Sequence, residues 1–134
     1  MSLISPVLRK STTGFLWWCP GCRSAHHINV GSASGPQWTW NGDADKPSFQ
    51  PSVLVRGIRQ DMTTEELIDY DHAAEKQTSD ELLNNPKFGT RCHVYVTDGQ
   101  IQFLGDCTHD HANRTVPIPA WPYKPEEYHI PGPV

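Results

Sequence analysis

The 134-residue sequence has no apolar run near the ~18 consecutive residues that a membrane-spanning helix requires. Its opening stretch, MSLISPVLRKSTTG, also lacks the long apolar segment of a secretory signal. No basic stripe is present, because 11 lysines and arginines stand against 15 acidic residues and give a net charge of -4. We therefore expect a cytoplasmic protein that binds neither a membrane nor nucleic acid.

Apolar residues are scarce, at 37% of the chain, whereas 12 prolines and 10 glycines favour turns over long regular elements. Five tryptophans, four tyrosines and four phenylalanines offset part of this shortage, because each buried ring removes a large apolar area from water. The length suits a single domain over residues 1–134. We expect its core to be thin, so that a bound metal ion would add much to its stability.

Short alternating segments separated by turn residues predict a mainly β fold, either a small sandwich or a partly open barrel stapled by a zinc site. Residues 61–86 depart from this pattern, because Thr63 opens a capping-box spacing that is typical of a helix start. We interpret them as a short helical insertion. The proline-rich segment 117–134 predicts an extended C-terminal tail, with Trp121 and Tyr123 as its anchors.

The stretch RCHVYVTDGQIQFLGDCTH, residues 91–109, is typical of a β-hairpin whose two-residue turn is the Asp-Gly pair. In that register one face is almost wholly apolar and carries Cys92 and Cys107. The opposite face is mostly polar and carries His93 and Asp106. Because a slip by one residue would scramble this division, the pattern supports the register and predicts different tasks for the two pairs.

The CPGC segment predicts a metal-binding knuckle, in which Cys19 and Cys22 direct both sulfurs to one point. Cys92 and Cys107 complete a set of four, which predicts a structural Zn2+ site. Two alternatives stay open: His26 replaces one of the cysteines, or all four remain free buried thiols. The absence of a second CxxC pair excludes a standard zinc ribbon.

The polar face of the hairpin predicts a second kind of site. His93 can act as a general base oriented by Asp106, and Ser52 can reach it as nucleophile if its strand pairs beside the hairpin. His109 would then be an auxiliary or metal-binding group. Alternatively, His93, Asp106 and His109 form an open metal site that activates water. A hydrogen-bonded network with no chemistry is the third interpretation.

Three segments resemble a family of small proteins of tailed phages and prophages: WWCPGCRSAHHINV, WTWNGDADKPSFQPSVLV and CHVYVTDGQIQFLGDCTHDHANRTVPIP. Some members are labelled ammonia monooxygenase, and relatives occur beside ubiquitin-like modifiers and proteins similar to their activating and conjugating enzymes. That neighbourhood implies a peptidase or deconjugating role. The matching positions are Cys19, Cys22, His26, Trp40, Asn41, Gly42, Pro51, Ser52, Cys92, His93, Asp106, Cys107 and His109.

Two functions of different classes follow from these observations. The first is a zinc-containing hydrolase of phage type, a peptidase that acts on a ubiquitin-like or other protein tail in the host cytoplasm. The second is a non-enzymatic, zinc-stabilised binding or virion protein that contacts a host protein through an exposed patch around Trp38 or Trp121. An enzyme requires Ser52, His93 and Asp106 within hydrogen-bond reach. The sequence leaves the oligomeric state open.

Overall fold

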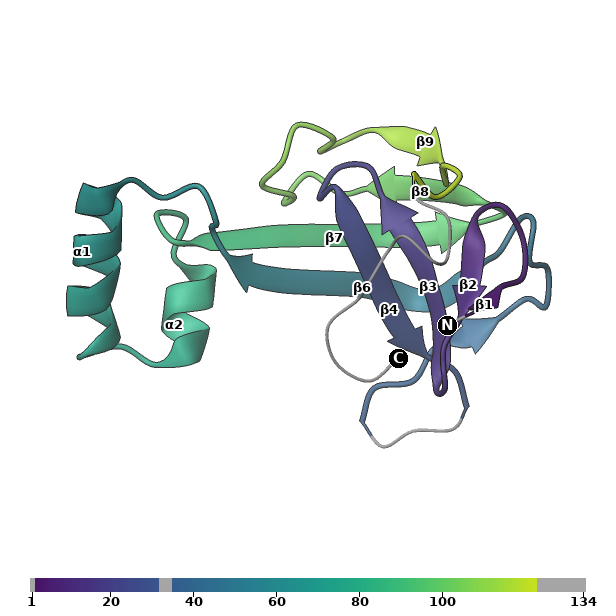
Figure 1. Ribbon diagram of the computed structural model, residues 1–134, viewed down its shortest axis with the longest axis horizontal. Coiled ribbons are helices and arrows are strands. Elements are labelled where there is room, and N and C mark those ends of the chain that lie inside the picture. The colour runs from purple at the N-terminus through teal and green to yellow at the C-terminus, as the bar shows by residue number, and fades with distance from the viewer. Residues whose placement is uncertain (1, 32–34, 123–134) are drawn as a thin grey trace.

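The computed structural model describes residues 2–31 and 35–122, which form two open antiparallel sheets (Figure 1). The first has the order β1-β2-β3-β4, with bounds Ser2–Leu3, Leu8–Lys10, Gly14–Cys19 and Ser24–Asn29. The second has the order β5-β6-β7-β8-β9, with bounds Thr39–Trp40, Phe49–Ile58, Gly89–Thr97, Gln100–Phe103 and Thr115–Pro117. The prediction of a mainly β fold is therefore confirmed.

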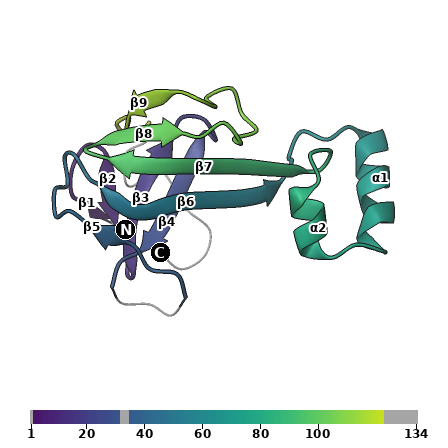
Figure 2. The same cartoon turned by 180° about the vertical axis from the view of Figure 1, so that it is seen from behind.

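Buried side chains from both sheets meet in one hydrophobic core. Trp17 of β3 stacks on Phe49 of β6, with ring centroids 5.6 Å apart. Val94 of β7 and Ile101 of β8 are almost fully buried beside them. Each such side chain contributes roughly 1.5–3 kcal/mol when fully buried. The core thus joins β3 to the inner face of β6, β7 and β8. Figure 2 shows these strands from behind.

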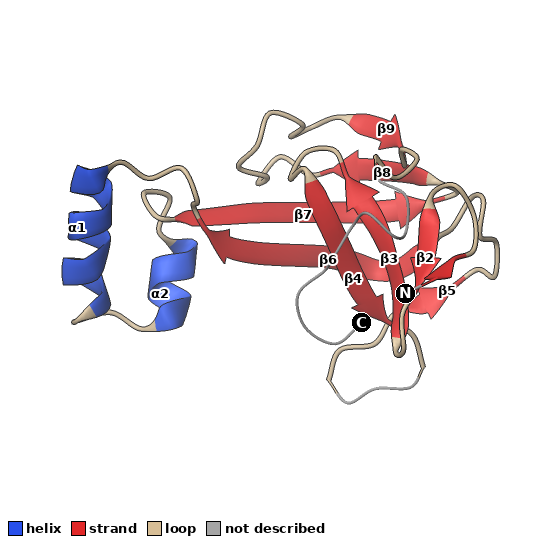
Figure 3. Ribbon diagram, in the orientation of Figure 1, coloured by secondary structure: helices blue, strands red, loops and turns tan. Residues whose placement is uncertain are grey.

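The insertion forms two short helices, α1 (Thr64–Ala74) and α2 (Ser79–Asn84). Thr63 and Thr78 each cap a helix N-terminus through a reciprocal capping box, so that the helix start predicted at Thr63 is confirmed. Both helices lie at the far end of the long ribbon made by β6 and β7 (Figure 3). Within the described part of the chain, neither is long and apolar enough to cross a membrane.

The hairpin of β7 and β8 has the turn that the sequence predicts. Asp98 and Gly99 both have positive φ values, 50° and 76°, as the favoured two-residue hairpin turn requires. The predicted register is confirmed from this turn as far as the pair Val94 and Phe103. Val94 and Phe103 are buried, and Tyr95 between them and the turn is exposed on the opposite face.

The N–H of Leu104 still donates to the carbonyl oxygen of His93 at 2.9 Å, and beyond Leu104 the hairpin departs from the regular register. Leu104 starts a tight turn in which the N–H of Cys107 donates to its carbonyl oxygen at 3.2 Å. Pairing resumes only when the N–H of Thr108 donates to the carbonyl oxygen of Arg91 at 2.9 Å. A continuous ladder would place Asp106 opposite Arg91, so the turn has added two residues to this strand.

β6 contains a bulge of its own. Phe49 pairs with Val96, and the next regular pair joins Val53 to Val94. Three residues of β6 therefore lie opposite a single residue of β7. Bulges of this kind change the direction of a side chain and are frequent beside active sites. The last residue of the bulge is Ser52.

Only the first part of the predicted tail, 117–134, falls within the described residues, which end at residue 122. Trp121 is buried, and its indole N–H donates to the carbonyl oxygen of Val7 at 3.1 Å. The guanidinium of Arg9 lies 3.8 Å from the Trp121 ring centroid. The second predicted anchor, Tyr123, lies outside the described residues.

Candidate active site and metal centre

Ser52, His93 and Asp106 make a continuous chain of contacts on the outer face of the second sheet. Ser52 Oγ lies 3.1 Å from Nε2 of His93. The other ring nitrogen, Nδ1, lies 3.2 Å from Oδ2 of Asp106. A nucleophile, a base and an orienting carboxylate within hydrogen-bond reach have the geometry of a serine hydrolase triad.

Irregular backbone on both sides of β7 produces this chain of contacts. The bulge in β6 presents Ser52, and the turn after β8 presents Asp106. β7 itself is regular, so consecutive side chains point to opposite faces of the sheet. His93 therefore points outward, whereas Cys92 before it is 2% exposed and points into the core.

Three further contacts surround His93 and Asp106. The N–H of His93 donates to Sγ of Cys107 at 3.3 Å, and the Cys107 thiol donates to the carbonyl oxygen of His93 at 3.4 Å. Arg91 Nη1 lies 3.8 Å from the Asp106 carboxylate. Cys107 thus fixes the backbone of His93. Sequence reasoning missed this role, because it assigned Cys107 to the metal.

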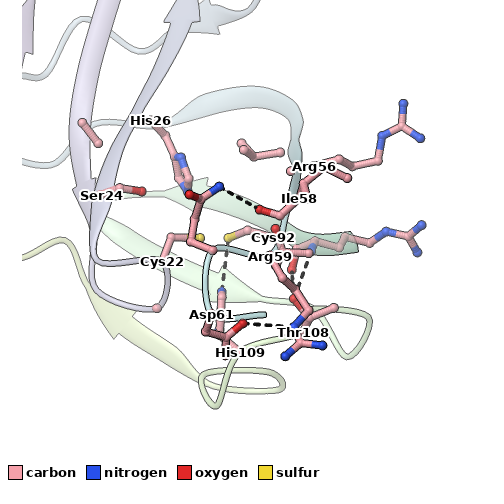
Figure 4. A pocket seen from close by; sticks show the side chains of 17 residues that line it. Cys22, Ser24, His26, Arg56, Ile58, Arg59, Asp61, Cys92, Thr108 and His109 are labelled. Carbon is pink, nitrogen blue, oxygen red and sulfur yellow. Dashed lines mark hydrogen bonds and ion pairs between the residues drawn. The ribbon is translucent and has the colours of Figure 1, made fainter. Parts of the chain in front are cut away.

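A second cluster lies on the inner side of the sheet, where Cys19, Cys22, Cys92 and His109 bring their ligand atoms within 4.8 Å of one another. Sγ of Cys19 lies 3.9 Å from Sγ of Cys92, and Nε2 of His109 lies 3.4 Å from the same sulfur. Figure 4 shows Cys92 and His109 pointing toward one another at this cluster. The structure thus brings three of the predicted cysteines together with His109.

The spacing of these atoms fits a tetrahedral metal ion. Zinc bonds to sulfur at about 2.3 Å, which separates two sulfurs of a tetrahedral site by about 3.8 Å. The separation between Cys19 and Cys92, 3.9 Å, is close to this value. Sulfur and imidazole ligands are also the donor types that zinc prefers. The four residues could therefore hold a metal ion.

The CPGC turn makes room for the imidazole. The Cys22 N–H donates to Sγ of Cys19 at 3.4 Å, as expected of a metal-binding knuckle. A Cβ atom on Gly21 would lie 2.4 Å from Cε1 of His109, so only glycine permits this approach. The N–H of His111 donates to Nδ1 of His109 at 3.2 Å, so Nε2 carries the ring proton and points toward the Cys92 sulfur. Binding a metal through Nε2 would move this proton to Nδ1 and release the hydrogen bond from His111.

Among the three sulfurs, the surroundings favour a thiolate at Cys19. Hydrogen bonds from the thiols of Cys22 and Cys92 lower the pKa of Cys19 far below its ordinary value, although its burial opposes this. The hydrogen bond to the Cys19 sulfur raises the pKa of Cys22 to about 12, and hydrogen bonds to Cys19 and Cys22 likewise raise that of Cys92. Burial lowers the pKa of His109. A cation binding here would displace the remaining thiol protons.

Cys107 and His26, which the sequence also predicts as ligands, lie outside this group of four. The sulfur of Cys107 contacts the His93 backbone instead. His26 is 4% exposed and packs edge-on against the Trp17 ring, with centroids 5.8 Å apart. The structure also separates His109 from His93, so the residues of the predicted open metal site lie on opposite faces of the sheet.

A binding module was expected to expose an aromatic patch around Trp38 or Trp121, and the structure shows no fully exposed ring at either position. Trp38 is half-buried against the core, and its indole N–H donates to the carbonyl oxygen of Ser52 at 3.2 Å. Trp121 is 9% exposed and packs against Trp18, with centroids 5.9 Å apart. Both rings therefore stabilise the fold and present little surface to a partner.

Comparisons with known proteins give one result. Residues 4–104 match a family model described as bacterial ubiquitination-like system serine protease (BubE). The match includes Ser52 and His93 and ends two residues before Asp106. No curated protein and no solved structure matches the chain.

Proposed function

Because the chain belongs to the BubE family of bacterial ubiquitination-like system serine proteases, we propose that it cleaves the tail of a ubiquitin-like or other protein by acyl transfer to Ser52. The 3.1 Å contact between Ser52 Oγ and His93 Nε2 carries this proposal. In it, Ser52 is the nucleophile, His93 the base, and Asp106 the group that orients the imidazole.

The reaction follows from this geometry. With Nδ1 protonated, His93 donates to Asp106 and accepts the Ser52 hydroxyl proton at Nε2. The Ser52 oxygen bonds to the carbonyl carbon of the scissile bond, and its proton moves to Nε2. The imidazolium gives this proton to the leaving nitrogen as the C–N bond breaks. Water, deprotonated by the same nitrogen, then attacks the ester carbonyl and releases the acyl part of the substrate as a carboxylate, and the proton on Nε2 returns to the Ser52 oxygen.

In this proposal the metal is structural. Zn2+ held by Cys19, Cys22, Cys92 and His109 would close its four coordination positions with protein ligands and leave none for water. It would tie the CPGC turn of the first sheet to β7 and to the segment after β8. Zinc therefore stabilises the strand that carries His93 and takes no part in bond cleavage. This differs from a zinc hydrolase, for which the family match gives no support.

A fluorophosphonate probe tests the reactive serine directly, because it transfers its phosphonyl group to an activated hydroxyl with loss of fluoride. We expect one adduct, located on Ser52 by peptide mass spectrometry, and none in Ser52→Ala. His93→Ala should slow labelling by about 10²–10⁴-fold, the usual contribution of a general base.

Ser11 provides a matched control, since its Oγ lies 2.7 Å from Nε2 of His27 in the first sheet. Ser11→Ala should leave labelling unchanged. An adduct on Ser11, or full labelling of Ser52→Ala, would contradict the assignment. A protein that binds a ubiquitin-like partner tightly and shows no adduct would instead be a binding module.

A further inference from the structure

We propose that an extended segment of the substrate protein binds as an additional strand along the free edge of β6, next to Ser52. This inference rests on the proposed serine protease function and adds the site that holds the substrate main chain. Strand addition to an exposed sheet edge is a recurrent mode of peptide recognition, in which main-chain hydrogen bonds supply affinity.

β6 is paired along most of its length on one side only. β7 pairs with it from Val53 to Ile58, whereas β5 pairs only with Phe49 and Gln50. Within residues 2–31 and 35–122, no other strand pairs with β6. Its second half therefore presents main-chain donors and acceptors that proteins usually cover or blunt.

Contacts at both ends of this edge show which residues face it. The carbonyl oxygen of Ser52 accepts from an indole N–H at 3.2 Å, and that of Ile58 accepts from a glutamine side chain at 3.1 Å. Main-chain groups alternate between the two sides of an antiparallel strand. Leu54 and Arg56 lie at the alternate positions between Ser52 and Ile58. Their N–H and C=O groups therefore face the same free side and can pair with a peptide.

A cavity of about 540 Å³ lies beside the edge, between β6 and the start of β4 (Figure 4). Val55 and Gly57 line it from β6, and Cys22 and Cys92 line it from the metal centre. The guanidinium of Arg56 points out of it and pairs with Asp80 at 2.8 Å. Every second side chain of an added strand would enter this cavity.

The apolar surface around the edge is suited to such an occupant. Leu54 on the outer face is 50% exposed, and Val55 on the inner face is 36% exposed. An added strand would cover both side chains. Leu54 follows Ser52 by two positions, which corresponds to about 7 Å along a strand. The scissile bond therefore lies about two residues from the nearest paired residue of the substrate.

An N-methyl scan tests the pairing on the substrate side. After the fluorophosphonate probe has established that Ser52 is reactive, the best-cleaved member of a library of internally quenched octapeptides is remade with one N-methyl group at each successive residue. We expect kcat/KM to fall about tenfold at alternate residues, because each loses one main-chain hydrogen bond. Methylation at the intervening residues should change it less than about threefold.

Two variants of Leu54 test the same edge on the protein side. Leu54→Pro removes the N–H and is tolerated, because that group faces away from β7. Leu54→Ala keeps the N–H and removes the side chain. With peptide cleavage normalised to the labelling rate of Ser52, Leu54→Pro should lose about tenfold in kcat/KM relative to Leu54→Ala.

The outcomes separate the edge from the reaction. A methylation profile without alternation, or equal cleavage by the two Leu54 variants, overturns strand addition. A protein that the probe labels at Ser52 but that cleaves no octapeptide also overturns strand addition, because pairing with the β6 edge requires only a short extended peptide. Each of these results leaves the serine reaction standing. Absence of an adduct on Ser52 removes the serine protease function and the inference with it.

Discussion

Replacing Asp106 by asparagine tests the part of the triad that the family match does not cover. The proposed reaction would turn His93 into an imidazolium whose Nδ1 lies 3.2 Å from the Asp106 carboxylate. Two unit charges at that distance attract by about 1.3 kcal/mol in bulk water and about 5 kcal/mol at an effective dielectric constant near 20. Each ~1.36 kcal/mol changes a rate tenfold, so these limits correspond to losses of about 10-fold and about 5,000-fold.

The surroundings of Asp106 place the expected loss of rate closer to the limit of about 10-fold than to that of about 5,000-fold. The Asp106 side chain is 41% exposed, and Arg91 lies 3.8 Å from the same carboxylate oxygen, so solvent and a second cation share its charge. We expect Asp106→Asn to lower the rate of fluorophosphonate labelling by about 100-fold. The Tm measured alongside separates this effect from unfolding.

Asp110 gives a matched control, because its Oδ1 lies 2.9 Å from Nδ1 of His111 and this carboxylate is fully solvated. Asp110→Asn should label at the rate of the parent protein. If Asp106→Asn stays within threefold of the parent while Ser52→Ala is inactive, the carboxylate does not support the base. The triad would then reduce to Ser52 and His93.

Four other changes have expected outcomes. Cys92→Ser should abolish bound zinc, measured by elemental analysis, and lower the Tm. Cys107→Ser should retain zinc and slow labelling, because Cys107 contacts the His93 backbone. Loss of zinc in both variants would return Cys107 to the ligand set. Gly21→Ala should weaken zinc binding in a chelator competition, since its methyl group displaces His109; unchanged affinity would remove His109 as a ligand. Burial lowers the pKa of His27 below its ordinary value of 6.5, so the unfolded chain binds a proton that the folded chain does not. The free energy of unfolding should therefore fall as pH drops below 6.5, and His27→Gln should reduce that fall in urea titrations.

Local patterns in the sequence predict the regular parts of the fold. The Asp-Gly turn and the alternation on both sides of it determine the register of β7 and β8, because a shifted register would bury polar side chains. The capping box at Thr63 is also complete within four residues. Both features depend on neighbours in sequence, so they require no knowledge of the remaining chain.

The composition of the metal cluster depends on an irregularity that the alternation does not reveal. In the regular register Cys107 would be the diagonal neighbour of Cys92, but the tight turn from Leu104 to Cys107 leaves the ladder. Cys107 then meets the His93 backbone, and His109 takes the position facing Cys92. The glycine at 105 is consistent with a tight turn, but it does not indicate how many residues the turn takes up.

The pairing of Ser52 with His93 is a tertiary contact that sequence reasoning could only state as a condition. It requires β6 to lie beside β7 and to contain a bulge at the right position. The sheet order is not encoded by the residues next to Ser52, whereas Pro51 directly before it is a residue type that strands confine to edges and bulges. Residue type identified the candidates, and the sheet determined which of them meet.

The segment that joins β8 to His109 has a consequence for how the protein can vary. Asp106, Cys107 and His109 lie within four positions, yet they face the triad, the backbone of the base and the metal cluster in turn. A substitution in this segment changes one of these three contacts. An insertion or deletion of one residue would shift all three together, and the opposite faces of β7 would lose their partners at once. Homologues that keep the reaction should therefore keep Asp106 and agree in the length of this segment, even where its other residues differ.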